Sequence, residues 1–218
     1  MTGRAGVRGM NLAFERLHGR ERALDGVPIA GRTDRAIVID VMRRIGVDPT
    51  DGAITALRDA YIDSLRTEIR RPVSDPSGVL PGVAPLLDAL EAEPGVVTAL
   101  LTGNFVLGAQ VKLQHFSIWD RFRFGAFGDD HSDRRHLVPV AVVHARRAGH
   151  PDFLPAHVVI IGDTPNDVEC AKAYGARAIG VTTGPYDRAT LSAAGADLTV
   201  DTLEDVPRLL TEIRKSTS

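Results

Sequence analysis

The chain has 218 residues, which at about 150 residues per domain corresponds to one or two domains with a full hydrophobic core. Hydrophobic residues make up 44% and charged residues 25%, values typical of globular proteins, which excludes wholesale disorder and a membrane protein. Lys and Arg number 26 against 28 Asp and Glu, so the net charge is −2 and the basic field that nucleic-acid binding needs is missing. We therefore expect neither a nucleic-acid nor a membrane partner.

The chain has a single cysteine, Cys170, which allows no intrachain disulfide and no cysteine metal cluster. This favours a reducing, cytoplasmic location. The first 20 residues lack the apolar core of a secretory signal, which agrees with that expectation. Because Cys170 falls inside a predicted helix, we expect a packed side chain rather than a nucleophile.

The first part of the sequence predicts helices. Apolar residues recur at three- and four-residue spacing in segments 7–17, 33–47 and 54–69, as amphipathic helices require. Thr33 or Asp34 and, further on, Asp51 are the predicted N-caps, and Gly46 is expected to end the second helix. Residues 71–78 are rich in helix breakers. We therefore predict a small helical-bundle domain over residues 1–78.

From residue 79 onward, strands and helices alternate. Apolar runs predict strands at 96–101, 124–127, 157–161, 177–181 and 198–200, and helices are expected at 82–92, 106–115, 138–148, 168–174 and the C-terminus. This order implies right-handed crossovers and a parallel sheet covered on both faces. We therefore predict an α/β, Rossmann-like core domain over residues 79–218. Its ligands should bind at the carboxyl ends of the strands.

A hydroxyl and a glycine follow the first predicted strand of this domain, in the sequence Thr102-Gly103-Asn104. Free backbone N–H groups at a helix N-terminus, with the Thr102 hydroxyl as a further donor, suit an anion. Taken alone, these residues favour the simpler interpretation, an ordinary helix cap with a tight turn.

A stronger signal follows the predicted strand 157–161. Asp163 ends an otherwise apolar strand, and Asp167 follows four residues later in the segment GDTPND. Two carboxylates beside an anion site suit Mg²⁺, which takes one or two carboxylates and completes its octahedron with other oxygens. The alternative is that Asp167 only caps a helix and Asp163 is a turn residue. Because a lone carboxylate at the end of a buried strand is costly, we favour the metal site.

Several of these segments resemble one family. LLTGN at 100–104, the helix with Lys112, GAFGDDHSDRR at 125–135 and residues 159–184 resemble the haloacid dehalogenase superfamily, in particular its phosphoglycolate-phosphatase-like members with a helical cap. By this resemblance, residues 1–78 are the cap domain. The turn GRTD at 31–34 falls where such caps often carry a substrate contact, so Arg32 becomes a candidate substrate-binding residue.

The resemblance implies Mg²⁺-dependent hydrolysis of a phosphate monoester, a small phosphorylated metabolite, through an aspartyl-phosphate. Thr102 would hold a phosphoryl oxygen, with Gly103 and Asn104 beside it. Asp163 would bind Mg²⁺, and Asp167 would support the metal's coordination. A cation should neutralise the phosphoryl group, and Arg134, or Arg135 as the alternative, stands where the family usually places a lysine. The oligomeric state is open, and a homodimer is among the expected assemblies.

The sequence departs from the family in one respect. The family nucleophile is the first Asp of a DxDGT segment, and no such segment occurs in these 218 residues. Asp25, Asp34 and Asp40 are no substitutes, because each lies in the helical part. We therefore expect the chain as given to lack the nucleophile and the first core strand, and to be inactive. In order of preference, the explanations are a start placed too late in an intact phosphatase, a catalytically dead phosphate- and metal-binding module, and a purely structural domain.

Overall fold

The structure is a computed structural model that describes residues 1–72 and 74–216. Val73, in the predicted linker, lies outside the described residues. The chain divides into two compact units, the first formed by Met1–Gly78, Thr102–Asp120 and Phe127–Ser132, the second by Val79–Leu101, Arg121–Ala126 and Asp133–Ser218. Among the described helices, none combines the length and the apolar character that a membrane span requires.

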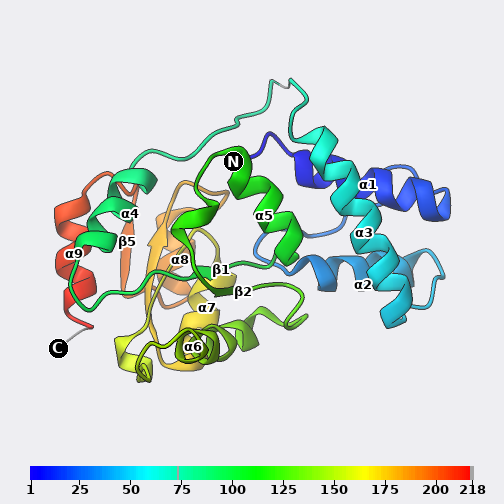
Figure 1. Cartoon of the computed structure of the whole chain (residues 1–218). Helices are drawn as coiled ribbons and strands as arrows, with labels where there is room; N and C mark the ends of the chain where they lie inside the picture. Colours follow the sequence, from blue (N-terminus) through cyan, green and yellow to red (C-terminus); the bar gives the residue numbers. More distant parts are fainter. Residues whose placement is uncertain (73, 217–218) are drawn as a thin grey trace. The chain divides into compact units, whose positions relative to one another are not determined.

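The first unit is helical. It contains α1 (Ala5–His18), α2 (Asp34–Arg44), α3 (Asp51–Glu68) and α5 (Val106–His115) (Figure 1). Thr33 caps α2 by accepting a hydrogen bond from the Ala36 N–H, as predicted. The cap of α3 is Thr50 and not Asp51, because the Thr50 hydroxyl reaches the Ala53 N–H. Asp51 is instead the first helical residue, where its negative charge favours the helix N-terminus.

The core of this unit includes a residue that lies far along the chain. Phe14, Met42 and Tyr61 are fully buried together with Phe105, which precedes α5. The rings of Tyr61 and Phe105 are 6.5 Å apart. Residues 102–120 and 127–132 therefore group with the N-terminal helices, whereas the sequence placed them in the α/β domain.

The second unit contains parallel sheets. Strands β3 (Val159–Gly162), β4 (Arg177–Val181) and β5 (Leu198–Val200) form one sheet in that order. Strands β1 (Leu100–Leu101) and β2 (Gly125–Ala126) form a separate parallel pair. The predicted α/β class with parallel strands is confirmed.

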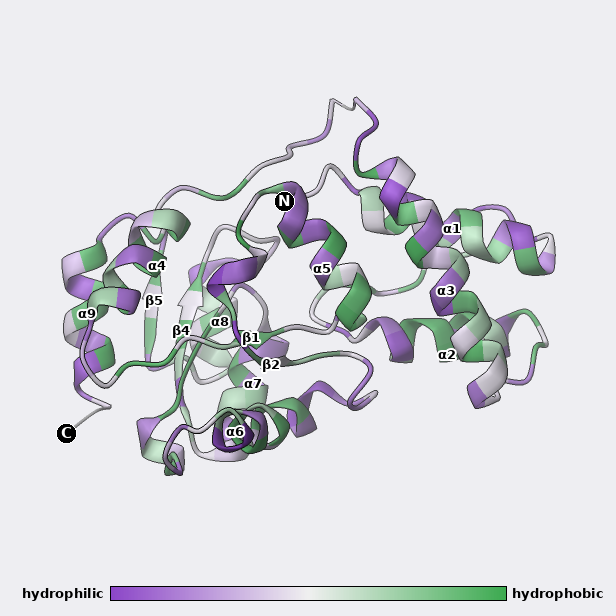
Figure 2. Cartoon of the chain, in the orientation of Figure 1, coloured by the Kyte–Doolittle hydropathy of each residue, from purple (hydrophilic) through white to green (hydrophobic). Residues whose placement is uncertain are grey.

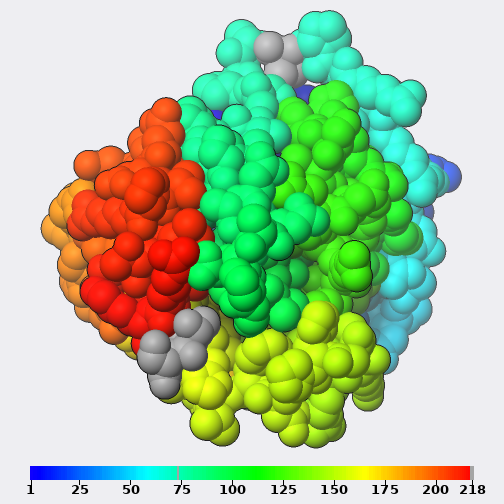
Figure 3. Space-filling view, turned by 60° about the vertical axis from the view of Figure 1, so that its left-hand side comes forward, coloured from blue at the N-terminus to red at the C-terminus, as the bar shows by residue number. Residues whose placement is uncertain are grey.

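Helices cover both faces of the β3–β4–β5 sheet. Side chains alternate along each strand, so successive residues of one strand pack against helices on opposite faces. Ile179 and Val181 of β4 pack with α4 (Val83–Ala92) and α9 (Val206–Arg214). Ala178 packs on the other face with α7 (Pro165–Tyr174) and α8 (Arg188–Ala193). Figure 2 shows hydrophobic and hydrophilic residues alternating around α9, and Figure 3 shows α4 and α9 side by side on one surface. Helix α6 (Leu137–Arg147) packs against β2.

The observed bounds of several elements differ from the predicted ones. The predicted strand 96–101 pairs only at Leu100–Leu101, and strand 124–127 only at Gly125–Ala126, because each contacts a short partner. Strand 157–161 is observed at Val159–Gly162, since a 3-10 turn occupies Pro155–His157. Helix 168–174 begins earlier, at Pro165, because the Thr164 side chain already caps it.

Candidate functional site

The turn from β3 into α7 holds both predicted metal ligands. Thr164 and Asp167 form a reciprocal capping box: the Asp167 N–H donates to Thr164 Oγ1 at 3.3 Å, and the Thr164 N–H donates to Asp167 Oδ2 at 3.0 Å. The Thr164 hydroxyl also donates to the same carboxylate oxygen at 2.8 Å. Asp167 thus does cap a helix, and the cap holds its carboxylate in one orientation.

Two glycines leave room for the two carboxylates. A Cβ atom at Gly162 would lie 2.3 Å from Asp167 Cγ, and one at Gly184 would lie 2.4 Å from Asp163 Oδ2. Real Cβ atoms do not approach other heavy atoms so closely, because interiors are already close-packed. Residues 162 and 184 must therefore be glycine if the carboxylates of Asp167 and Asp163 are to keep their observed positions.

Arg134 is the cation that contacts this turn. Its Nη2 forms an ion pair with Asp167 Oδ1, and the side chains are only 16% and 6% exposed. Arg135 instead pairs with Asp133 at 2.6 Å and is 62% exposed. The Sγ of Cys170 donates to the Arg134 carbonyl at 3.0 Å, which links α7 to the segment that carries Arg134. Of the two arginines that the sequence offered, Arg134 lies at the acidic pair.

The two carboxylates have different surroundings. Asp167 uses one oxygen for Arg134 and the other for Thr164. Asp163 is half-buried and forms no salt bridge with any residue in the described part of the chain. Burial raises the pKa of Asp163, the negative charge of Asp167 raises it further, and Arg134 acts in the opposite direction. A cation beside Asp163 would relieve this electrostatic cost.

The donor set fits a hard divalent cation of the magnesium type. Two carboxylates, Asp163 and Asp167, are what Mg²⁺ commonly takes from a protein. Within residues 1–72 and 74–216, no group of three or more His, Cys, Asp or Glu forms a larger metal cluster. An ion of this type completes its coordination with water and substrate oxygens.

Cys170 is buried in α7 and is not a nucleophile. Its side chain is 0% exposed, and burial raises the pKa of the thiol to about 11. At neutral pH the thiolate that would attack a substrate is therefore scarce. The packing role that the sequence indicates agrees with these surroundings.

The predicted anion-binding residues lie together in the first unit. The Asn104 N–H and Nδ2 both donate to Thr102 Oγ1, at 3.2 Å and 2.7 Å. A Cβ atom at Gly103 would lie 2.2 Å from the Arg32 carbonyl oxygen, so the turn at 31–34 passes directly against residues 102–104. The Asp34 N–H donates to the Gly103 carbonyl at 2.6 Å. Thr102, Gly103, Asn104 and Arg32 are thus neighbours in space.

The Arg32 side chain is engaged within the same unit. Its Nη2 forms an ion pair with Asp40 at 2.5 Å, and its Nη1 donates to the Pro28 carbonyl at 3.2 Å. The side chain is 27% exposed, so one part of the guanidinium still faces solvent. A substrate anion at Arg32 would compete with Asp40.

Sequence reasoning missed a buried polar cluster beside this turn. Lys112 on α5 donates to Asn104 Oδ1, and its ammonium lies 6.0 Å from the centre of the Tyr61 ring. Asp34 Oδ2 accepts a hydrogen bond from the Phe105 N–H at 2.9 Å. Burial raises the pKa of Asp34 and lowers that of Lys112, while the attraction between the two opposes both shifts. The signal in the sequence was Lys112 itself, a lysine between the apolar residues Val111 and Leu113.

The structure therefore arranges the predicted residues as two groups. Arg134, Asp163 and Asp167 lie in the second unit, at the carboxyl end of β3. Thr102, Gly103, Asn104 and Arg32 lie in the first unit, directly after β1 in the chain. Polar residues that directly follow parallel strands lie where ligands bind in α/β folds of the Rossmann type.

Comparisons with known proteins identify a family model and relatives that are similar to this chain. The family described as HAD-hyrolase-like matches residues 136–206. Phosphoglycolate phosphatase from Synechococcus elongatus is 28% identical over 178 residues, which cover 80% of this chain and 76% of the relative. Phosphoglycolate phosphatase from Salmonella typhimurium is 27% identical over 179 residues, covering 80% and 68% of the two chains.

Solved structures share the fold over nearly the whole chain. A phosphate complex of CbbY from Rhodobacter sphaeroides superposes with a TM-score of 0.68 at 20% identity, covering 94% of this chain and 90% of the other. A predicted phosphoglycolate phosphatase from Haemophilus somnus gives 0.67 at 17% identity, covering 96% and 92%. Together with the sequence matches, this makes the chain similar to phosphatase-like members of the haloacid dehalogenase superfamily.

Proposed function

We propose that the protein is a Mg²⁺-dependent hydrolase of small phosphate monoesters, acting on a phosphorylated metabolite in the cytoplasm. The observation that carries this proposal is the group Arg134, Asp163 and Asp167 at the end of β3, where two carboxylates and one buried guanidinium meet. The similarity to curated phosphoglycolate phosphatases supports the phosphatase chemistry.

Each residue of the second unit has a role in this proposal. Asp163 would hold Mg²⁺, and Asp167, oriented by Thr164 and Arg134, would support it. When bound, the ion would offset the negative charge of the phosphoryl group. Arg134 holds Asp167 in place and adds a positive charge at the same point, as phosphoryl transfer requires.

Thr102 would bind a phosphoryl oxygen as a hydrogen-bond donor. Its Oγ1 already accepts two hydrogen bonds from Asn104. A hydroxyl that accepts in this way still has its own proton to donate. Lys112 holds the Asn104 side chain through its Oδ1 and so keeps Asn104 pointing at Thr102.

The nucleophile has no counterpart in these 218 residues, because they contain no DxDGT segment. We therefore propose that the chain as given binds Mg²⁺ and phosphate without turnover, and that hydrolysis through an aspartyl-phosphate needs the DxDGT segment. The same observation favours a second candidate, a phosphate- and metal-binding module of the same fold that has lost catalysis altogether.

The first test measures Mg²⁺ binding by the 218-residue chain with isothermal titration calorimetry. Asp163→Asn should weaken Mg²⁺ binding at least tenfold, because it removes one of the two carboxylates that would hold the ion. Asp152→Asn is the matched control: this aspartate is 73% exposed in its side chain and should leave binding unchanged. Equal Mg²⁺ affinity in the wild-type chain and Asp163→Asn would refute the metal site.

The second test separates an enzyme from a binding module. The coding sequence upstream of the Met1 codon is read for an in-frame DxDGT segment, and protein with and without such a segment is assayed for phosphate release from a panel of phosphate monoesters. Turnover that requires the segment and is abolished by EDTA supports the phosphatase. Binding without turnover even when DxDGT is present selects the module, and turnover that ignores EDTA contradicts metal dependence.

A further inference from the structure

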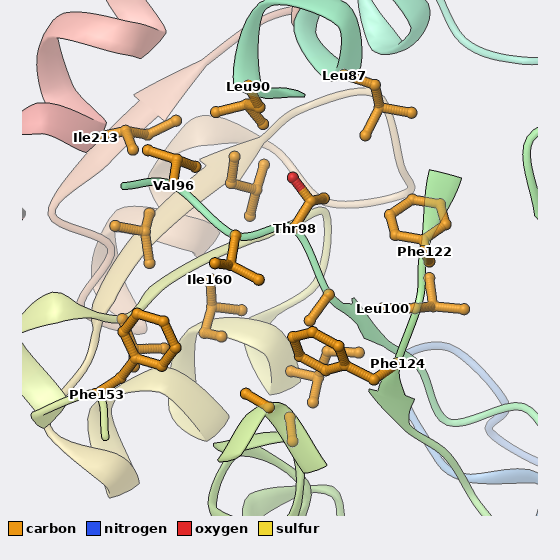
Figure 4. Close-up of a pocket in the computed structure, with 18 of the residues that line it drawn as sticks. Leu87, Leu90, Val96, Thr98, Leu100, Phe122, Phe124, Phe153, Ile160 and Ile213 are labelled. Atoms are coloured by element: carbon orange, nitrogen blue, oxygen red, sulfur yellow. The ribbon is translucent and has the colours of Figure 1, made fainter. Parts of the chain in front are cut away.

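Two features outside the acidic turn have room for a ligand. One is an apolar cavity of about 490 Å³ in the second unit, lined by side chains that include Leu90, Val96, Phe124 and Ile160 (Figure 4). It borders β1 and β3, at the place of the first core strand that these 218 residues are expected to lack, so we assign it to the fold and not to a ligand. The other feature is the N-terminal end of α1, in the first unit.

Helix α1 begins without a side-chain cap. Arg4, the residue before its first turn, makes no capping hydrogen bond with its side chain, and the first turn contains no acidic residue. The Ala5 N–H donates to the Thr2 carbonyl at 2.9 Å. The N–H groups of Gly6 and Val7 have no acceptor among residues 1–72 and 74–216. Unpaired N–H groups at a helix start carry the positive end of the helix dipole.

A buried hydroxyl lies against this helix end. Tyr61 on α3 is 1% exposed, and its hydroxyl forms no hydrogen bond with any residue in the described part of the chain. Its Oη lies 3.5 Å from the position that a Cβ atom at Gly6 would occupy, and 3.6 Å from that of a Cβ atom at Gly108 on α5. A buried hydroxyl without a partner is costly. Tyr61 is therefore suited to a ligand that accepts a hydrogen bond beside Gly6.

The ammonium of Lys112 lies at the same place. Its Nζ is 3.1 Å from the Cβ position at Gly6 and 6.0 Å from the centre of the Tyr61 ring. One of its three protons is donated to Asn104 Oδ1, which leaves two for another acceptor. Lys112 and Gly6 are half-buried, so a solute can reach both. The ammonium and the positive helix end repel each other, and an anion between them relieves this repulsion.

The local charges favour a singly charged anion. The positive charge consists of one ammonium and about half a unit charge from the helix end. Asp34 is buried nearby, and its carboxylate attracts Lys112. A phosphate dianion would add two negative charges close to Asp34, whereas a carboxylate adds one. A carboxylate also has two oxygens, enough to accept hydrogen bonds from several donors at once.

We propose that the N-terminal end of α1 binds the carboxylate group of a small organic acid. The N–H groups of Gly6 and Val7 donate to this carboxylate from the helix end. The Tyr61 hydroxyl and the Lys112 ammonium donate to it from α3 and α5. We call these four residues the α1 site. It is separate from the acidic turn at the end of β3, and it does not rest on the proposed hydrolase activity.

The probe is sodium acetate, titrated into the isotope-labelled full chain while amide resonances are followed by NMR. We expect saturable shifts of the Gly6 and Val7 amide protons, because each N–H gains an acceptor. Sodium chloride at the same concentrations should give no saturable shift at these amides. Inorganic phosphate should bind there more weakly than acetate, because of its second negative charge.

Two variants test the donors without removing a charge. Tyr61→Phe removes only the hydroxyl, which has no partner in the described part of the chain, so stability should not fall while acetate affinity drops about threefold or more. Gly6→Ala places a Cβ atom 3.1 Å from Lys112 Nζ and should weaken acetate binding at least tenfold, although alanine favours a helix.

Matched controls make the same chemical changes elsewhere. Tyr174→Phe alters a half-buried tyrosine of α7 in the second unit, and Gly52→Ala adds a Cβ atom that meets nothing within 4 Å. Both should leave acetate binding unchanged. Urea denaturation establishes that every variant is folded before it is titrated.

Several results would overturn the proposal. Absence of saturable shifts at Gly6 and Val7 would refute the α1 site, and so would equal acetate affinity in the wild-type chain, Tyr61→Phe and Gly6→Ala. Shifts that sodium chloride reproduces would show charge screening only. Tighter binding of inorganic phosphate than of acetate at these amides would contradict the choice of a carboxylate. None of these readouts uses Mg²⁺ or turnover, so their outcome is independent of the hydrolase proposal.

Discussion

At the scale of single residues, the site depends on backbone positions as much as on its carboxylates. Asp163 and Asp167 could be found in the sequence, because acidic residues after an apolar strand are costly without a function. Gly162 and Gly184 carry no functional group, and the need for them follows only from the distances to the two carboxylates. A local sequence pattern cannot show such close approaches.

Replacing Gly162 with alanine tests this packing. The new Cβ would lie 2.3 Å from Asp167 Cγ, so Asp167 must move away from Thr164 or Arg134. We expect Gly162→Ala to lower the free energy of unfolding by about 1–3 kcal/mol, as overpacking usually does. Urea denaturation measures the change. Gly52→Ala is the control, since a Cβ atom at that helical position meets nothing within 4 Å and should be neutral or stabilising.

The buried carboxylate of Asp34 and the half-buried ammonium of Lys112 test a second residue-scale argument. Removing one of two opposite charges that are shielded from water leaves the other without compensation, which costs up to about 3 kcal/mol. We expect that loss for Lys112→Met and a similar one for Asp34→Asn, measured by urea denaturation. The double variant should lose less than the sum of the two, because neither charge is then left alone. Strictly additive losses would show that the two groups do not interact.

At the scale of elements, periodicity predicted the existence of helices and strands better than their ends. The bounds of α5, β4 and β5 are those expected from the sequence, because apolar spacing and burial agree there. Helix α7 begins at Pro165, where a capping threonine and a proline fix the start before the first apolar residue. In the predicted strand 96–101 only two residues pair with another strand. Pairing requires a neighbouring strand, and an apolar pattern along the sequence does not show which strand lies alongside.

The short 3-10 helix Arg134–His136 gives a prediction for pH. Asp133 caps it, and the hydrogen bond from Arg135 lowers the pKa of Asp133 to about 2. A carboxyl whose pKa is lower in the folded state stabilises the fold above its unfolded pKa of about 3.9, and this contribution disappears as the pH falls to about 2. The stability difference between the wild-type chain and Asp133→Asn should therefore shrink from pH 4 to pH 2. Urea midpoints measured across this range check it, and a constant difference would contradict the lowered pKa.

At the scale of the whole molecule, the chain passes between its two units several times. The boundary predicted near residue 78 is one crossing, but residues 102–120 and 127–132 return to the helical unit. Phe105 fills the core of that unit and is 1% exposed. The helical unit is therefore built from three separate segments of the chain and not from one continuous segment.

A fragment of residues 1–78 should not fold as the helical unit does. It lacks Phe105 and α5, whose side chains cover part of Tyr61 and α3. We expect reduced helicity by circular dichroism and no cooperative urea transition. Phe105→Ala in the full chain provides the comparison, and it should cost about 3–5 kcal/mol, as removal of a buried aromatic side chain usually does. A fragment with a sharp, cooperative transition would show that the N-terminal helices form a complete core.

The sequence alone determined the class of fold and most of the elements, because apolar periodicity is a local property of the chain. Only the tertiary structure decided that Arg134 and not Arg135 meets Asp167, and that Lys112 and Asp34 lie close enough to interact. These outcomes depend on contacts between residues far apart in the chain, and such contacts leave no local pattern in the sequence.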